Sequence, residues 1–198
     1  MKNLLPLLLF SILFINCQPT EKIEEIVVIG GGLMGSTTAW QLSNYGENLL
    51  LIEQQDSVYS YGSSYGEARI ARSSNRGNDI WSYLHNRSVK EAKKLVGYLE
   101  SNPRGDQTYD ITDIYTTAPV TYIGRTRIYD KLYNSLIRQK VDYKMATNQA
   151  EGKELFEVNL PDSVLMQVEY NEHSGNINPK KIINYCQQAV LQLSLIHI

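Results

Sequence analysis

Three glycines in a fixed pattern are the first residues whose spacing predicts a chemical task. Gly30, Gly32 and Gly35 satisfy the pattern G-x-G-x-x-G. The first glycine permits a tight turn, the second lets a pyrophosphate approach the backbone, and the third lets a helix pack against a strand. Backbone N–H groups at the start of that helix would then face the phosphates. The pattern therefore predicts a dinucleotide site.

An acidic residue completes this fingerprint. Glu53 follows a second apolar run, close to the separation of roughly 20 residues expected for a carboxylate that bonds a ribose hydroxyl. A glycine-rich turn with an incidental acid is the alternative, and it is disfavoured because all the conditions are met in order. The fingerprint alone does not separate FAD from NAD.

The elements around these residues are predicted to be a strand, a helix and a strand. Ile26–Ile29 is a continuous apolar run, as expected for a strand buried on both faces of a parallel sheet. Residues 33–45 can be helical, with Gly46 placed to follow the helix end, and Leu49–Ile52 is a second apolar run. This order predicts an α/β fold with a Rossmann-type parallel sheet.

Two arginines three positions apart form the next candidate group. Arg69 and Arg72 lie in the sequence GSSYGEARIAR, which spans residues 62–72. The surrounding stretch, residues 58–78, lacks sustained periodicity and is predicted to be a long ordered loop, and long loops in compact domains are usually functional. A guanidinium fork can bind a carboxylate through two hydrogen bonds, with solvated loop charges as the alternative.

This segment resembles the stretch after the second strand in D-amino acid oxidase-like flavoproteins, in their sarcosine and N-methyl amino acid oxidase branch. The resemblance implies FAD as the cofactor, with Ser63 and Arg69 beside the flavin and Arg72 on the substrate carboxylate. It also implies an FAD-binding domain interrupted by an α+β substrate domain. Tyr65 and Asn75 depart from the family, which has His and an aromatic residue there, so substrate identity does not follow.

The resemblance implies that the full-length protein is an enzyme that oxidises a carboxylate-bearing amine, such as sarcosine or another N-methyl amino acid, to an imine with formation of hydrogen peroxide. This chain itself is expected to be incomplete and inactive. The partners implied are a small amino acid and either oxygen or an electron carrier. No protein nucleophile or metal is required, because the flavin accepts the hydride. Another FAD-dependent amino acid dehydrogenase and a non-enzymatic fragment remain as alternatives. A formal net charge of -2 gives no reason to expect nucleic acid as a partner.

The resemblance also divides the chain into parts. Residues 24–78 correspond to the first part of the FAD-binding domain, residues 79–170 to a helical insertion and the start of the substrate domain, and residues 171–192 to a return helix. Later strands of the family would lie beyond residue 198, so we expect a C-terminally truncated chain. Residues 193–198 resemble translated sequencing adapter and are expected to be a non-native tail.

Apolar spacing predicts three further helices. Residues 79–100 carry apolar side chains at helical intervals, and so does the region around Leu132. The third helix is predicted to open at Pro179, where Asn178 is placed as the N-cap.

Two strands are predicted from apolar alternation, over residues 109–115 and 164–170, with a turn at residues 174–175. His85 and His173 each lack a carboxylate at triad spacing, so surface or helix-face roles are expected for them.

The first 17 residues predict an export signal. One lysine precedes an apolar run over residues 4–15, which suits a signal peptide and is short for a bilayer span. The run ends at Cys17 in a context that resembles a bacterial lipobox, so we expect export and a lipidated Cys17, in the periplasm or anchored to a membrane. A buried N-terminal helix is the alternative. The other cysteine, Cys186, has no metal-ligand spacing.

Overall fold

The computed structural model describes residues 26–45, 49–55, 62–64, 66–72, 79–159, 161, 164–169 and 173–193. Some predictions concern residues outside these ranges. They are the export signal of residues 1–17, which includes Cys17, the predictions for Gly46, Tyr65 and Asn75, and the part of the expected tail over residues 194–198. They stay predictions. Within the described ranges, no helix combines the length and the apolar character that crossing a membrane requires.

The predicted strand–helix–strand unit is present. It consists of β1 (Ile26–Ile29), α2 (Leu33–Ser43) and β2 (Leu49–Ile52). β1 and β2 pair in parallel over all four residues of each strand. The expected α/β arrangement at this end of the chain is therefore confirmed.

Helix α2 ends two residues earlier than predicted. The side chains of Ser43 and Asn44 both donate hydrogen bonds to the carbonyl oxygen of Trp40, at 2.9 and 2.7 Å. That oxygen is the acceptor that an α-helix continuing through Asn44 would use. The backbone N–H of Tyr45 turns instead to the carbonyl of Leu42, at 2.9 Å. Short polar side chains thus compete with the backbone and end the helix.

Strand β1 is covered on one face, where two were predicted. Ile26 and Val28 pack against a core cluster that contains residues of α2 and of α7 (Pro179–Leu193). The opposite face carries Val27 and Ile29, whose side chains are 49% and 82% exposed. Residues of α2 and α7 both belong to the cluster on the side of Ile26 and Val28. Among the described residues the other face is left uncovered, so the prediction of a strand buried on both faces was wrong.

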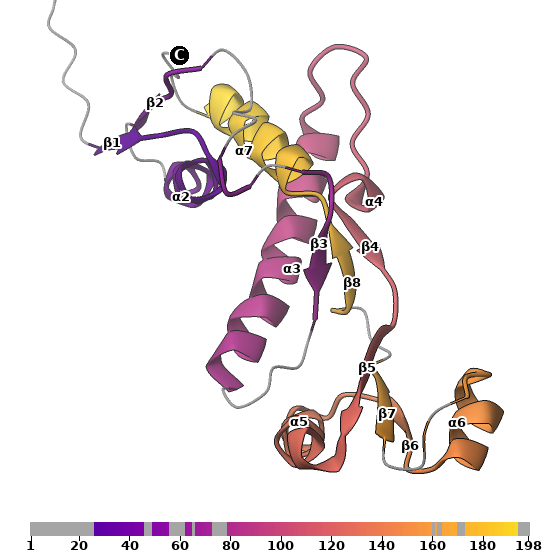
Figure 1. Cartoon of the computed structure of the whole chain (residues 1–198). Coiled ribbons are helices and arrows are strands. Elements are labelled where there is room, and N and C mark those ends of the chain that lie inside the picture. The colour runs from indigo at the N-terminus through magenta and orange to yellow at the C-terminus, as the bar shows by residue number, and fades with distance from the viewer. Residues whose placement is uncertain are drawn as a thin grey trace, which may run out of the picture.

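Two long helices complete the main core. Helix α3 (Asp79–Ser101) matches the prediction for residues 79–100, and α7 packs against both α2 and α3 (Figure 1). Asn178 caps α7 as predicted, because its side-chain oxygen accepts a hydrogen bond from the backbone N–H of Lys181 at 3.1 Å. The helical members of the core include Ala39, Trp40, Val89, Leu95, Val96, Leu99, Ala189 and Val190.

A short antiparallel sheet joins distant parts of the chain. Its strands β3 (Arg69–Ala71), β8 (Gly175–Ile177) and β4 (Tyr115–Thr117) lie in the order β3-β8-β4. The stretch over residues 58–78 was predicted to be loop throughout, and residues 174–175 a turn. Both predictions missed strands, because three-residue strands carry almost no local signal and their partners lie far away in the sequence.

The strand predicted over residues 109–115 is wrong. The structure has a short helix, α4 (Ile111–Ile114), followed by β4. Asp110 causes the turn by accepting a hydrogen bond from the backbone N–H of Thr112 at 2.8 Å, and this contact lowers the pKa of the Asp110 carboxyl. An N-cap therefore overrode the alternating apolar pattern.

A second unit follows β4. It contains β5 (Val120–Arg125), α5 (Thr126–Gln139), β6 (Tyr143–Ala146), α6 (Gln149–Phe156) and β7 (Val164–Glu169). The strands form an antiparallel sheet in the order β5-β7-β6, at the bottom of Figure 1. The predictions of α5 and β7 are confirmed, whereas β5, β6 and α6 were missed.

Candidate functional site

The loop between β1 and α2, residues Gly30 to Gly35, is the glycine loop. Gly30 has a φ angle of 95°, which side chains rarely allow, and its N–H donates to the carbonyl of Ile52 at 2.7 Å. This bond extends the pairing of β1 and β2 by one residue. The loop therefore leaves the strand through the tight turn that the first glycine of the pattern predicts.

Gly35 brings α2 close to this turn. A Cβ atom at Gly35 would lie 1.7 Å from the carbonyl oxygen of Gly30 and 2.9 Å from its carbonyl carbon. Only a residue without a side chain fits between these backbone atoms. The helix is thus placed against the end of β1 as the third glycine of the pattern predicts.

Gly32 leaves open space where a phosphate would be placed. It is the N-cap of α2, and a Cβ atom there would meet nothing within 4 Å. No side chain among the described residues caps the helix at this position. The N–H groups of the first turn are the donors that an anion at a helix N-terminus uses. The residues present therefore fit a pyrophosphate.

Glu53 lies next to the glycine loop. One oxygen of its carboxylate, Oε2, accepts a hydrogen bond from the N–H of Gly31 at 2.5 Å. The other, Oε1, accepts from the N–H groups of Gln54 and Gln55 at 2.7 and 3.1 Å. A carboxylate offers about four acceptor positions, so these bonds leave room for a ribose hydroxyl. The structure thus brings the predicted acid and the predicted loop together.

Two residues that sequence reasoning missed hold the same loop. The carbonyl oxygen of Gly31 accepts hydrogen bonds from the hydroxyl of Ser36 at 2.6 Å and from the side-chain amide of Gln187 at 2.9 Å. Ser36 is five residues away and directly follows the glycine pattern, so a local search could have found it. Gln187 is 156 residues away, in α7, and nothing in the sequence indicates its contact.

The arginine segment, residues 62–72, is held differently. The guanidinium of Arg69 donates to the carbonyl oxygens of Ala68 at 2.8 Å and Ser63 at 3.3 Å. Gly66 has a φ angle of 103°, and a Cβ atom there would lie 3.1 Å from Nη1 of Arg69. Ser63, Arg69 and Arg72 are all exposed. The predicted substrate and flavin ligands of this segment therefore face solvent.

The main core links the arginine segment to the unit that carries the glycine loop. Ala71, between the two arginines, is buried in the same cluster as Leu49 and Leu51 of β2. The hydrogen bonds described for Arg69 join it to its own segment, and those of the glycine loop join it to β2, to Glu53 after that strand, to α2 and to α7. The two groups are thus built on one core.

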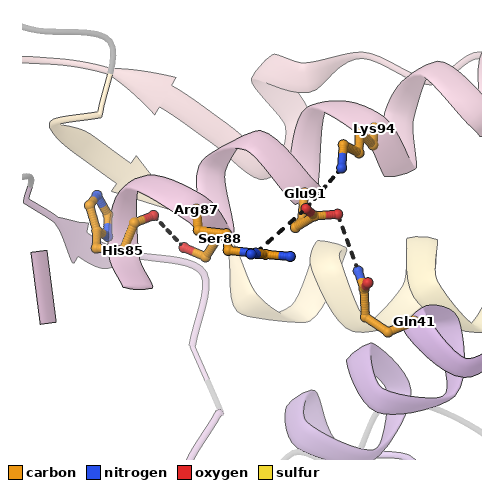
Figure 2. Close-up of polar contacts among 6 residues, drawn as sticks. All are labelled: Gln41, His85, Arg87, Ser88, Glu91 and Lys94. Atoms are coloured by element: carbon orange, nitrogen blue, oxygen red, sulfur yellow. Dashed lines mark hydrogen bonds and ion pairs between the residues drawn. The ribbon is translucent and has the colours of Figure 1, made fainter. Parts of the chain in front are cut away.

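A polar cluster around Glu91 of α3 links that helix to α2 (Figure 2). Glu91 contacts Lys94 at 3.0 Å, Gln41 of α2 at 3.4 Å and Arg87 at 4.0 Å. The hydrogen bond from Lys94 is the main reason why the pKa of Glu91 is lowered. This cluster joins α2 to α3 on a partly exposed surface, and it contains no nucleophile with an adjacent base.

The side chain of His85 contacts the backbone of His173. The Nε2 atom of His85 in α3 lies 2.5 Å from the carbonyl oxygen of His173, which precedes β8. In the same turn of α3, Ser88 donates a hydrogen bond to the carbonyl of His85 at 2.7 Å (Figure 2). The expectation of a helix-face role agrees with this contact for His85, which joins α3 to the chain before β8.

The thiol of the cysteine in α7 has low reactivity. Cys186 is buried, and burial raises the pKa of its thiol to about 12. The thiolate is the reactive form, so a thiol with this pKa is inert at neutral pH. In the described part of the chain, no three His, Cys, Asp or Glu side chains gather as metal ligands would.

Comparisons with known proteins extend these observations. A model of the family described as "FAD dependent oxidoreductase" matches residues 25–194. The human peroxisomal sarcosine oxidase is 25% identical over 177 residues, which cover 87% of this chain and 41% of that protein. The chain spans less than half of the length of the curated relatives that it matches.

Two solved structures share the fold. An open form of NikD, an amino acid oxidase of nikkomycin biosynthesis, superposes with a TM-score of 0.64 at 16% identity, covering 88% of this chain and 42% of that one. L-proline dehydrogenase from P. horikoshii superposes with a TM-score of 0.63 at 20% identity, covering 88% of this chain and 44% of that one. The likeness concerns the arrangement of the elements described above.

Proposed function

Since this chain belongs to the FAD-dependent oxidoreductase family, with residues 25–194 matched by the family model, we propose that it serves the oxidation of a carboxylate-bearing amine. The preferred substrates are sarcosine or another N-methyl amino acid. The observation that carries the proposal is the glycine loop, which is already formed and uncapped, with the Glu53 carboxylate 2.5 Å from the N–H of Gly31.

The glycine loop and Glu53 bind the adenosine diphosphate part of FAD. Gly30 and Gly35 shape the loop, Gly32 leaves space for the pyrophosphate, and Glu53 accepts a hydrogen bond from the ribose. The N–H groups at the start of α2 add a favourable dipole for the phosphate charge. These roles are supported by the φ angle of Gly30 and by the close approach at Gly35.

The arginine segment takes the flavin ring and the substrate. Arg69 lies in β3, and Arg72 directly follows that strand. Ser63 and Arg69 lie beside the flavin, and Arg72 binds the substrate carboxylate through its guanidinium fork.

The chemistry divides between the cofactor and the chain. When bound, FAD supplies the acceptor for the hydride that leaves the carbon next to the amine. The substrate also loses its N–H proton, so its C–N single bond becomes the C=N bond of an imine. The task of Arg72 is to bind the carboxylate and so fix the position of that carbon. Oxygen then takes up the two electrons and two protons as hydrogen peroxide.

Replacement of Arg72 tests this assignment. Arg72→Ala removes a charge-assisted pair worth about 1.5–3 kcal/mol, so substrate use should fall roughly ten- to a hundred-fold while FAD affinity stays unchanged. The measurement is anaerobic bleaching of the bound flavin by sarcosine and by N-methyl amino acids, in the full-length protein that the resemblance implies. Arg87→Ala, at an exposed arginine of α3, is the matched control and should behave as wild type.

The electron acceptor is tested in the same samples. Admitting oxygen to the reduced protein should restore the flavin absorption and yield one hydrogen peroxide per imine. Restoration by a soluble carrier but not by oxygen would identify a dehydrogenase and contradict this part of the proposal. Unchanged bleaching kinetics in Arg72→Ala would contradict the carboxylate assignment.

We also propose the domain division and the location of the protein. Residues 24–78 and 171–192 contribute to the FAD-binding domain, and residues 79–170 include the start of a substrate domain. Residues 1–17 direct export, with lipidation at Cys17. Mass spectrometry of the native protein should find a modified Cys17 as the first residue, and an intact Met1 would contradict this.

A further inference from the structure

The carbonyl group of Gly31 is held by two donors of different origin. Ser36 reaches it from the first turns of α2, and Gln187 reaches it from α7, with distances of 2.6 and 2.9 Å. A carbonyl oxygen has two lone pairs, so these two bonds occupy its acceptor capacity. The peptide group between Gly31 and Gly32 is therefore fixed in orientation by a local and by a remote side chain.

Gln187 and Glu53 approach Gly31 together. A Cβ atom on Gly31 would lie 3.0 Å from Nε2 of Gln187 and 3.0 Å from Oε2 of Glu53. Glu53 binds the N–H of Gly31 and Gln187 binds its carbonyl oxygen, so both peptide groups of this residue have a side-chain partner. The conformation of the loop between β1 and the N-cap Gly32 is thus determined from outside the β1–α2–β2 unit as well as from inside it.

The helix that carries Gln187 is firmly anchored. Its start is capped by Asn178, and the neighbours Cys186, Ala189 and Val190 are buried in the main core. Gln187 is partly buried on the same helix, so its amide is presented from a rigid element. A rigid support of this kind improves the precision of a binding site.

We propose that Gln187 is a positioning residue of the dinucleotide site, which orients the Gly31–Gly32 peptide so that the N-terminus of α2 can receive a diphosphate. The inference rests on the proposed function for the identity of the ligand. It adds that α7, far away in the sequence, is part of the site. Gln187 does not touch the diphosphate itself; it acts through the backbone of Gly31.

Variants of Gln187 in the 198-residue chain test the inference, with ADP as the probe. Gln187→Leu removes the amide, and Gln187→Glu keeps the shape but, when ionised, removes the donor. One hydrogen bond of this kind corresponds to a roughly three- to ten-fold weaker ADP affinity. The matched control is Gln192→Leu, because Gln192 lies on the same helix and donates to the carbonyl of Asn102 at 2.9 Å. This control should bind ADP as wild type does.

A ligand-free measurement separates this inference from the proposed function. The amide ¹⁵N resonance of Gly32 reports hydrogen bonding at the carbonyl of Gly31, because both belong to one peptide group. Both Gln187 variants should shift this resonance and speed hydrogen exchange over residues 31–36, whereas Gln192→Leu should not. A general loss of stability in a Gln187 variant would instead speed hydrogen exchange throughout the main core as well.

The outcomes are distinct. If wild type binds ADP and the Gln187 variants bind it equally well, the inference is overturned and the proposed function stands. If wild type does not bind ADP, the proposed function fails. Independently of ADP binding, an unchanged Gly32 resonance in both Gln187 variants overturns the positioning role. Shifted resonances with weakened ADP binding, confined to Gln187, support both.

Discussion

The glycine loop and the arginine segment lie on one core but are stabilised in different ways. Side chains and backbone from β2, α2 and α7 hold the glycine loop, with Gly31 itself buried. The arginine segment exposes Arg69 and Arg72, and Arg69 bonds carbonyl oxygens of its own segment. The glycine loop is therefore fixed by contacts from several elements, whereas the two arginines lie on an exposed segment.

The difference suits the task proposed for each region. A diphosphate is bound largely by backbone N–H groups, whose direction depends on the fold, so the fold must fix them in advance. A guanidinium binds by its own fork at the end of a long side chain, so solvent exposure before binding costs little. Four substitutions test this contrast, in order of decreasing effect.

Gly35→Ala should cause the largest loss. The new Cβ would stand 1.7 Å from the carbonyl oxygen of Gly30, and backbone cannot move aside as a side chain can. We expect the free energy of unfolding to fall by about 3 kcal/mol, the upper end for overpacking, in urea denaturation. Gly97→Ala is the control, because it lies in α3 with nothing within 4 Å and should gain about 0.5–1 kcal/mol. Equal stability of Gly35→Ala and wild type would show that the close approach is absent.

Gly32→Val should abolish ADP binding with little change in stability. Among the described residues, apart from the chain neighbours, nothing lies within 4 Å of the new Cβ, so the ligand-free chain accepts it, while the side chain fills the space for the pyrophosphate. Replacing Gly by Val at an N-cap should cost no more than about 1 kcal/mol of the free energy of unfolding. Isothermal titration with ADP is the measurement. Retained binding would mean that the phosphate lies elsewhere.

Glu53→Gln should weaken ADP binding roughly ten- to a hundred-fold, because a hydrogen bond to a charged acceptor is worth about 1.5–3 kcal/mol. The amide oxygen can still accept from the N–H of Gly31, but the amide nitrogen cannot accept the bonds that Gln54 and Gln55 donate to Oε1. AMP should show the same loss, because it carries the ribose as well. Glu91→Gln, at the carboxylate that joins α3 to α2, is the control and should leave the affinity unchanged. Equal losses in both variants would contradict a specific ribose contact.

Arg72→Ala should have the smallest effect on the fold. Arg72 is exposed, and surface substitutions of this kind change the free energy of unfolding by no more than about 0.5 kcal/mol. Urea denaturation beside Gly35→Ala gives the comparison directly. A loss of several kcal/mol would mean that the arginine supports the fold, and the contrast between the two regions would fail.

Local signals explain which parts of the fold could be predicted. The apolar runs of β1 and β2, the helical spacing of α3 and α5, and the N-cap Asn178 of α7 each depend on residues close in sequence. The glycine pattern is local too, and its geometry at Gly30 and Gly35 agrees with the prediction. Where two local signals competed, as at Asp110, the apolar alternation gave the wrong element.

Distant pairing explains the parts that were missed. Gly175 was predicted as part of a turn, yet it starts β8, and a Cβ atom there would lie 2.0 Å from the carbonyl oxygen of Thr116. β3 is a strand through its antiparallel pairing of Arg69–Ala71 with β8. Neither short strand has a pattern of its own, so each depends on contacts that a single sequence does not display.

The sequence by itself determined the glycine loop, the acid that follows β2 and the charge of the arginine segment. Backbone turns, residue spacing and side-chain charge are properties of neighbouring residues, so they can be read directly. Only the tertiary structure decided that Gln187 joins Ser36 at the carbonyl of Gly31, and that β3 is a strand. The physical reason is that a hydrogen bond between residues 156 positions apart depends on how the main core packs α7 against α2.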